Sequence, residues 1–121
     1  MVTDDVETVE KTSDLVKFLE KVQMSEELVR LYRGIRRNYG HARLRGRAYR
    51  SRVGPLLVVT NDRGLGRASG SIPGVDVVRV DDLSILDLAP GGVPGRLTLW
   101  TESSMATLAA PKKEVEMTVE A

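Results

Sequence analysis

PLLVVTNDRGLGRASGSIPGVDVVRV, residues 55–80, is the segment that decides the fold. Residues 55–60, PLLVVT, are a short continuous apolar run, which is the pattern of a strand buried on both faces, and VDVVRV at residues 75–80 gives a second strand. Between them, turn-forming residues leave room only for a short helix at about residues 65–70. Strands that alternate with helices indicate a parallel sheet with helices on its faces, so the sequence predicts the α/β class.

Two further elements follow toward the C-terminus. Asp81 or Asp82 is expected to cap a short helix that stops before Pro90. Two Pro-Gly turns then lead into a third strand, RLTLW at residues 96–100, and Thr101 is expected to start a last helix. The C-terminal part therefore contributes one more strand to the predicted sheet.

The N-terminal part of the chain contains two amphipathic patterns. Apolar residues recur at helical spacing over residues 13–22. A second helix is expected to begin at Ser25, where acidic residues follow at once, and to fray within residues 34–40. A fourth strand would need strand character before Thr3, where only residues 1–2 remain, so it is barely present.

Composition limits the class of protein. The chain has 121 residues and no cysteine, which excludes disulfides and thiolate metal sites. No apolar run approaches the roughly 18 residues of a membrane span, and the N-terminus does not resemble a signal peptide. We therefore expect a cytoplasmic protein without a membrane partner, with one domain over residues 1–110 and a flexible tail over residues 111–121.

Half of the 18 basic side chains lie in one acid-free block. Nine arginines occur between Arg30 and Arg52, and no Asp or Glu occurs from Leu28 to Asn61. The rest of the chain carries all 17 acidic side chains, so an acidic body carries a cationic segment. Such segregation is typical of proteins with a polyanion partner. The alternative is a solvated helix face that runs into a basic loop, but nine arginines without an acid repel one another.

The composition of this block fits RNA, because guanidinium groups grip phosphate oxygens in pairs and tyrosines stack on unpaired bases. We expect phosphate contacts from Arg36, Arg37, Arg43, Arg45, Arg47, Arg50 and Arg52. We expect stacking or base-edge contacts from Tyr39, His41 and Tyr49, and a further phosphate contact from Arg96. Few apolar side chains anchor the block, so it is expected to be a loop without a fixed conformation until RNA binds.

Little in the sequence indicates an enzyme. His41 is the single histidine and has no carboxylate near it in the sequence, and neither a catalytic-triad order nor a Walker loop is present. Glycines within residues 64–70, between two strands, imitate a dinucleotide-binding fingerprint. Their spacing is wrong and the helix is too short, so a dinucleotide-binding enzyme is the weakest alternative. We expect no catalytic residue, no metal site and no cofactor.

Four short motifs follow one another in the C-terminal part: IPGV at residues 72–75, LDLAPG at 86–91, PGRL at 94–97 and WT at 100–101. In order and spacing, this string resembles the C-terminal part of ribosomal protein L four of the large subunit, of the archaeal and eukaryotic type. The upstream strings EKTSDLVKFLEKV and LRGRAYRSRVGPLLVV are similar to the same family. The resemblance extends over about residues 2–108.

The resemblance implies a structural constituent of the large ribosomal subunit. It implies a three-layer α/β/α body with a small, mostly parallel sheet that binds ribosomal RNA, contacts neighbouring ribosomal proteins and supports assembly. The N-terminal half of the family has no counterpart here, so the chain resembles either a C-terminal half or a split version in which a separate chain supplies the missing half. Gly70, Ser71 and Val93 depart from the family pattern. A free-standing RNA-binding regulator on the same fold is the alternative.

Overall fold

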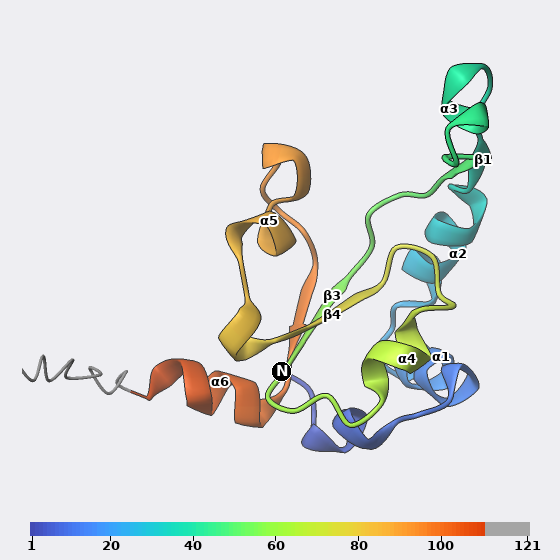
Figure 1. Ribbon diagram of the computed structural model, residues 1–121. Helices are drawn as coiled ribbons and strands as arrows, with labels where there is room; N and C mark the ends of the chain where they lie inside the picture. The colour runs from blue at the N-terminus through green and yellow to red at the C-terminus, as the bar shows by residue number, and fades with distance from the viewer. Residues whose placement is uncertain (111–121) are drawn as a thin grey trace, which may run out of the picture.

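A three-stranded parallel sheet lies at the centre of the molecule (Figure 1). The computed structural model describes residues 1–110, so the tail expected at residues 111–121 lies outside the described residues. The sheet has the order β4-β3-β5 and consists of β3 (Leu56–Val59), β4 (Asp76–Arg79) and β5 (Thr98–Trp100). These are the three strands predicted from the sequence, and the α/β class with a small parallel sheet is confirmed.

Strand β3 is central because both of its neighbours pair with it. Leu57 lies opposite Val77 on β4 and opposite Leu99 on β5. All four residues of β3 are at most 2% exposed, so both faces of this strand are covered. This explains why its sequence is a continuous apolar run rather than an alternating one.

The fourth strand is reduced to a single residue, as expected for residues 1–2. Val2 forms a parallel bridge with Thr101. The Val2 N–H donates to the Trp100 carbonyl at 2.8 Å, and the Glu102 N–H donates to the Val2 carbonyl at 3.1 Å. The N-terminus therefore pairs beside β5, at the edge of the sheet opposite β4.

Helices lie on both sides of the sheet (Figure 1). One face is covered by α1 (Thr12–Lys21), α2 (Ser25–Arg33), α4 (Leu65–Ser69) and the 3-10 turn η1 (Asp4–Thr8). The other side carries α5 (Ile85–Leu88), α6 (Glu102–Ala109) and the 3-10 turns η2 (Val80–Asp82) and η3 (Pro90–Gly92). The elements within the arginine-rich segment, beyond α2, project away from this body and are described below.

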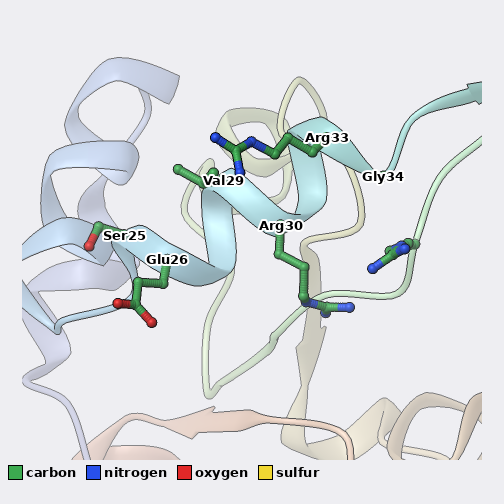
Figure 2. Close-up of a pocket in the computed structure, with 7 residues that line it drawn as sticks. Ser25, Glu26, Val29, Arg30, Arg33 and Gly34 are labelled. Atoms are coloured by element: carbon green, nitrogen blue, oxygen red, sulfur yellow. The ribbon is translucent and has the colours of Figure 1, made fainter.

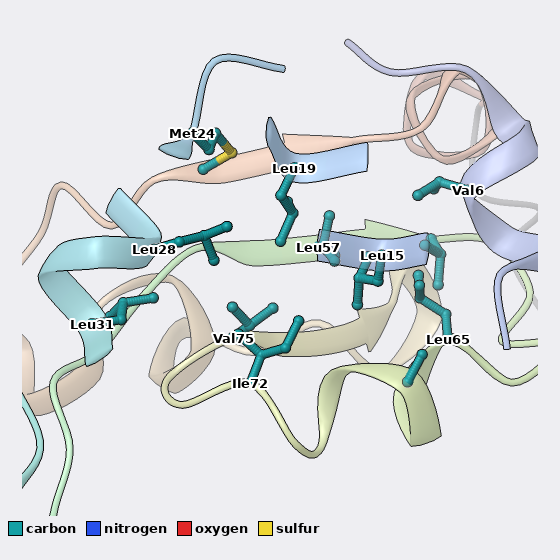
Figure 3. Packing of buried hydrophobic residues seen from close by; sticks show 12 residues of the cluster. Val6, Leu15, Leu19, Met24, Leu28, Leu31, Leu57, Leu65, Ile72 and Val75 are labelled. Carbon is teal, nitrogen blue, oxygen red and sulfur yellow. The ribbon is translucent and has the colours of Figure 1, made fainter. Parts of the chain in front are cut away.

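The hydrophobic core lies between the sheet and the first group of helices (Figure 3). Leu15 and Leu19 are one helical turn apart on α1, and both are fully buried. Leu28 and Leu31 contribute from α2, and Leu57 contributes from β3. Each buried aliphatic side chain of this size stabilises the fold by roughly 1.5–3 kcal/mol, so the predicted amphipathic patterns hold α1 and α2 on the sheet.

The start of α5 differs from the expectation. Asp81 and Asp82, expected as its cap, lie in the turn η2, and the N-cap is Ser84. Asp87 Oδ2 accepts hydrogen bonds from Ser84 Oγ at 2.6 Å and from the Ser84 N–H at 3.0 Å. Both bonds lower the pKa of Asp87, and the bond from the Ser84 hydroxyl has the larger effect. A Ser with an acidic residue three positions later is a capping box, a signal that the sequence reading missed.

A buried carboxylate ties the N-terminal turn to the carboxyl end of the sheet. Glu7 is 6% exposed, and its Oε1 accepts hydrogen bonds from the Thr60 N–H at 2.9 Å and from the hydroxyls of Thr101 and Ser103 at 3.3 Å. Asp4 Oδ1 accepts from the Ser103 N–H at 3.0 Å. Open parallel sheets usually bind ligands at this position, between strands whose connections diverge. Here the protein fills it with its own carboxylate.

Replacing Glu7 with alanine should destabilise the chain, because the partly buried Thr60 N–H would lose its acceptor. We expect the free energy of unfolding to fall by roughly 1–3 kcal/mol, measured by urea titration. The control is Asp5→Ala in the same turn, since the Asp5 side chain is exposed. Equal effects of the two substitutions would contradict a structural role for the buried carboxylate.

Candidate nucleic-acid interface

The arginine-rich segment forms an arm that extends from the end of α2 away from the sheet (Figure 1). Its stem is an antiparallel ribbon of β1 (Arg36–Arg37) and β2 (Tyr49–Arg50), and its tip is the short helix α3 (His41–Leu44). Arg36 lies opposite Arg50, and Arg37 lies opposite Tyr49. We call residues 36–50 the arm.

Local hydrogen bonds explain why the arm is a hairpin rather than the loop that was expected. The Asn38 N–H donates to the Ala48 carbonyl at 2.9 Å, and Asn38 Nδ2 donates to the Arg47 carbonyl at 2.7 Å. Gly40 and Gly46 have φ values of 67° and 77°, so the chain turns where glycine carries no steric penalty. In the sequence Asn38 only interrupts the basic pattern, whereas in the structure it closes the stem.

The predicted contact residues of the arm and its base are all exposed, and they are Arg36, Arg37, Tyr39, His41, Arg43, Arg45, Arg47, Tyr49, Arg50 and Arg52. The salt bridges found among residues 1–110 involve other basic side chains. The guanidinium groups of the arm therefore face water without an acidic partner from the described part of the chain. Such groups are available for phosphate oxygens.

Arg30, at the base of the arm, is used differently. Its guanidinium forms a bidentate pair with Glu27, one helical turn earlier, and its Nη2 donates to the Val53 carbonyl at 3.0 Å. The hydrogen bond from Arg30 lowers the pKa of Glu27, and the same bond raises the pKa of Arg30. Arg30 thus joins α2 to the segment that returns from the arm to β3.

Arg96 also serves the fold and lies apart from the arm. Its side chain is 5% exposed. Nε donates to the Gly54 carbonyl at 2.9 Å, Nη1 donates to the Asp87 carbonyl at 2.8 Å, and Nη2 pairs with Asp76. A guanidinium with three internal partners is not available to a phosphate, so the structure assigns Arg96 a structural role instead of the expected RNA contact.

Arg33 was omitted from the expected contact set, but it lines a hollow of about 500 Å³ on the outer side of α2 (Figure 2). Val29, Gly34 and Arg52 line the same hollow. The signal in the sequence is the spacing of Val29 and Arg33, which are four residues apart and therefore share one face of the helix. This hollow lies where the arm joins the body.

The dinucleotide alternative has no site in the described residues. The glycines that imitate a fingerprint begin α4, a helix of five residues. Asp62 Oδ1 already accepts hydrogen bonds from the N–H groups of Gly64 at 3.0 Å and Gly66 at 3.1 Å. Both bonds lower the pKa of Asp62, and the bond from Gly66 has the larger effect. A negative side chain thus lies where a pyrophosphate would bind.

Two kinds of feature are absent from residues 1–110. No group of three or more His, Cys, Asp or Glu side chains is arranged to hold a metal ion. No helix in this part of the chain is both long and apolar enough to cross a membrane.

Comparison with known proteins gives a consistent result. Residues 1–111 match the family described as "Ribosomal protein L4/L1 family". Similar proteins include "Large ribosomal subunit protein uL4" of Sulfurisphaera tokodaii, 41% identical over 109 residues, and that of Methanocaldococcus jannaschii, 41% identical over 108 residues. The Drosophila melanogaster protein of the same name is 40% identical over 108 residues. Each match covers 89% of this chain but only 41%, 43% and 27% of the respective relatives.

Arg96→Met should lower stability without weakening RNA binding. The substitution keeps an aliphatic stem but leaves two carbonyl oxygens and Asp76 without their donor, so we expect the free energy of unfolding to fall by roughly 2–3 kcal/mol in urea titration. Arg79→Met is the matched control, because Arg79 is half exposed and has only one ion pair, to Asp81 at 3.3 Å. Loss of RNA affinity in Arg96→Met, under conditions where the variant is folded, would return Arg96 to the contact set.

Proposed function

Because the chain belongs to the ribosomal protein L4/L1 family, we propose that it is a structural constituent of the large ribosomal subunit that binds ribosomal RNA and supports assembly. The relatives named above carry the name of a large-subunit protein, and the match covers nearly the whole described chain. The role is structural rather than catalytic, and its place is the ribosome in the cytoplasm. The observation that carries the proposal is the exposed, acid-free arm.

The arm contacts RNA chiefly through phosphate. Arg36, Arg37, Arg43, Arg45, Arg47, Arg50 and Arg52 bind phosphate oxygens, and Tyr39, His41 and Tyr49 stack on bases or contact base edges. The arm lies far from most of the acidic side chains, which belong to the body, so a polyanion is attracted to the arm and repelled by the remainder. This polarity sets the orientation in which the protein approaches RNA.

We also propose that one surface of this chain contacts another polypeptide. The side of the sheet that carries α5 and α6 exposes large apolar side chains, namely Ile85, Leu86, Leu97, Met105 and Leu108. Ile85 is 81% exposed and Leu86 is 77% exposed, which is costly unless a partner covers them. The chain spans less than half the length of the relatives it matches. We assign this side to contact with the polypeptide that corresponds to the rest of the relatives, or with a neighbouring ribosomal protein.

RNA affinity should fall steeply with salt. If about five to seven arginines displace counterions, the slope of log K against log salt should be roughly −3.5 to −6. Fluorescence anisotropy with labelled ribosomal RNA fragments at several salt concentrations measures this slope. Arg45→Gln should make it shallower by about 0.7–0.9, whereas Arg79→Gln, on β4, should leave it unchanged. A slope near zero for the unaltered chain would mean that the arm does not bind phosphate.

Co-sedimentation tests the ribosomal assignment itself. The full chain, added to large ribosomal subunits at low salt, should sediment with them, and a variant with Arg43, Arg45 and Arg47 changed to Gln should remain mostly in the light fractions because its charge contacts are lost. A chain that binds RNA but never sediments with subunits would instead be a free-standing RNA-binding regulator. Saturable binding of a dinucleotide, without RNA binding, would favour the enzyme alternative.

A further inference from the structure

Two neighbouring hollows lie at the base of the arm and share two of their lining residues, and we call the pair the groove. The first, of about 500 Å³, lies on the outer side of α2, and the second, of about 250 Å³, lies at the start of the ribbon between Arg36 and Arg50. Gly34 and Arg52 line both of them. The larger hollow lies within the roughly 300–1,000 Å³ of typical small-molecule sites, and the smaller one is lined by guanidinium groups.

The stem of Arg52 is held in place at the junction of the two hollows. A Cβ atom on Gly34 would lie 2.7 Å from Cδ and 2.8 Å from Cγ of Arg52, so these methylene groups occupy the space that the glycine leaves free. Gly34 is buried, whereas Arg52, which packs on it, is exposed. A long cationic side chain that packs its stem on backbone keeps its charged head in a defined place.

The charged side chains that line the larger hollow differ in whether they already have a partner within the protein. Arg30 is neutralised by Glu27, and the carboxylate of Glu26 lines the hollow at the start of α2. Arg33, at the end of the same helix, and Arg52 are the cations that remain for a ligand. Val29 is 47% exposed and contributes an apolar surface. Arg33 follows Val29 by one helical turn, and its side chain lies back toward Val29 (Figure 2). A planar guanidinium beside an exposed aliphatic group suits a flat aromatic ring.

We propose that this groove binds one unpaired nucleotide within a single RNA strand. The base lies against Val29 and the guanidinium of Arg33, its phosphate binds Arg52 at the junction, and the adjacent phosphate binds between Arg36 and Arg50. A duplex cannot present a base in this way, because its bases are paired and stacked. The inference rests on the proposed RNA-binding function and deepens it, since it assigns the base of the arm a preference for single strands while the tip binds either form.

The test compares single-stranded and duplex RNA with the full chain. The probes are an oligouridylate with one internal 2-aminopurine and a duplex of matched length, at one low salt concentration. The altered proteins are Arg33→Gln, Arg52→Gln and the charge-neutral Gly34→Ala, whose new Cβ displaces the Arg52 stem. The matched control is Arg43→Gln, which removes one exposed charge from the tip of the arm.

Arg33→Gln and Arg52→Gln should weaken binding of the single strand by roughly tenfold, the loss expected for a charge-assisted contact. The control should lose only about two- to threefold, and it should lose this for both probes. The change in 2-aminopurine fluorescence on binding should persist in Arg43→Gln and disappear in Arg33→Gln. Gly34→Ala should lose single-strand affinity while its unfolding midpoint shows that it is folded.

Two other sets of results would contradict the groove alone or the proposed function together with the groove, and they can be told apart. If every substitution weakens both probes according to charge alone, and 2-aminopurine responds equally in all variants, the groove is not a nucleotide site although the arm binds RNA. If the unaltered chain binds neither probe and does not sediment with large subunits, the proposed function fails together with the groove.

Discussion

The burial of β3 on both faces is the constraint on which the rest of the structure depends. Its four residues are at most 2% exposed, so the strand must have a neighbour on each side and helices above and below. Its amino end is joined to the arm by residues 51–55, and its carboxyl end reaches the Glu7 carboxylate through the Thr60 N–H. A five-residue segment therefore connects the most buried strand of the body to the cationic arm.

Two arginines that belong to the basic inventory stabilise this junction instead of binding a ligand. Arg30 links α2 to the Val53 carbonyl, and Arg96 links the Gly54 carbonyl to Asp87 and Asp76. The two arginines therefore hold residues 53 and 54, which lie just before Pro55 and β3. Hydrogen bonds to charged donors contribute roughly twice as much as neutral ones, so the returning segment of the arm is fixed at its base. The exposed arginines beyond it are positioned by this fixed base.

The sequence predicted those parts of the fold that rest on local patterns. The strand at residues 56–59 is a continuous apolar run, the strand at residues 76–79 lies in a segment rich in valine, and α1 has a clear helical period. Their positions were therefore confirmed to within one or two residues. The cap at Ser84 was missed because two adjacent acids offered a competing signal. The role of Arg96 depends on groups from residues 54, 76 and 87, which are brought together only by the fold. No pattern along the chain shows such convergence, and for the same reason Arg33 was not recognised beside Arg52.

The arm combines order and electrostatic repulsion, and this combination bears on how it binds. Asn38 and the ribbon hydrogen bonds hold the backbone of the arm in one arrangement, so little backbone entropy is lost when a phosphate is bound. The same arrangement keeps like charges close together, which disfavours the hairpin in the absence of a partner. An anion that binds the folded arm removes this repulsion. Because the anion binds the folded hairpin and not the unfolded segment, its binding also stabilises the hairpin. Under the proposed RNA-binding function, Asn38 therefore contributes to RNA affinity through the backbone of the arm, although its side chain donates to the Arg47 carbonyl.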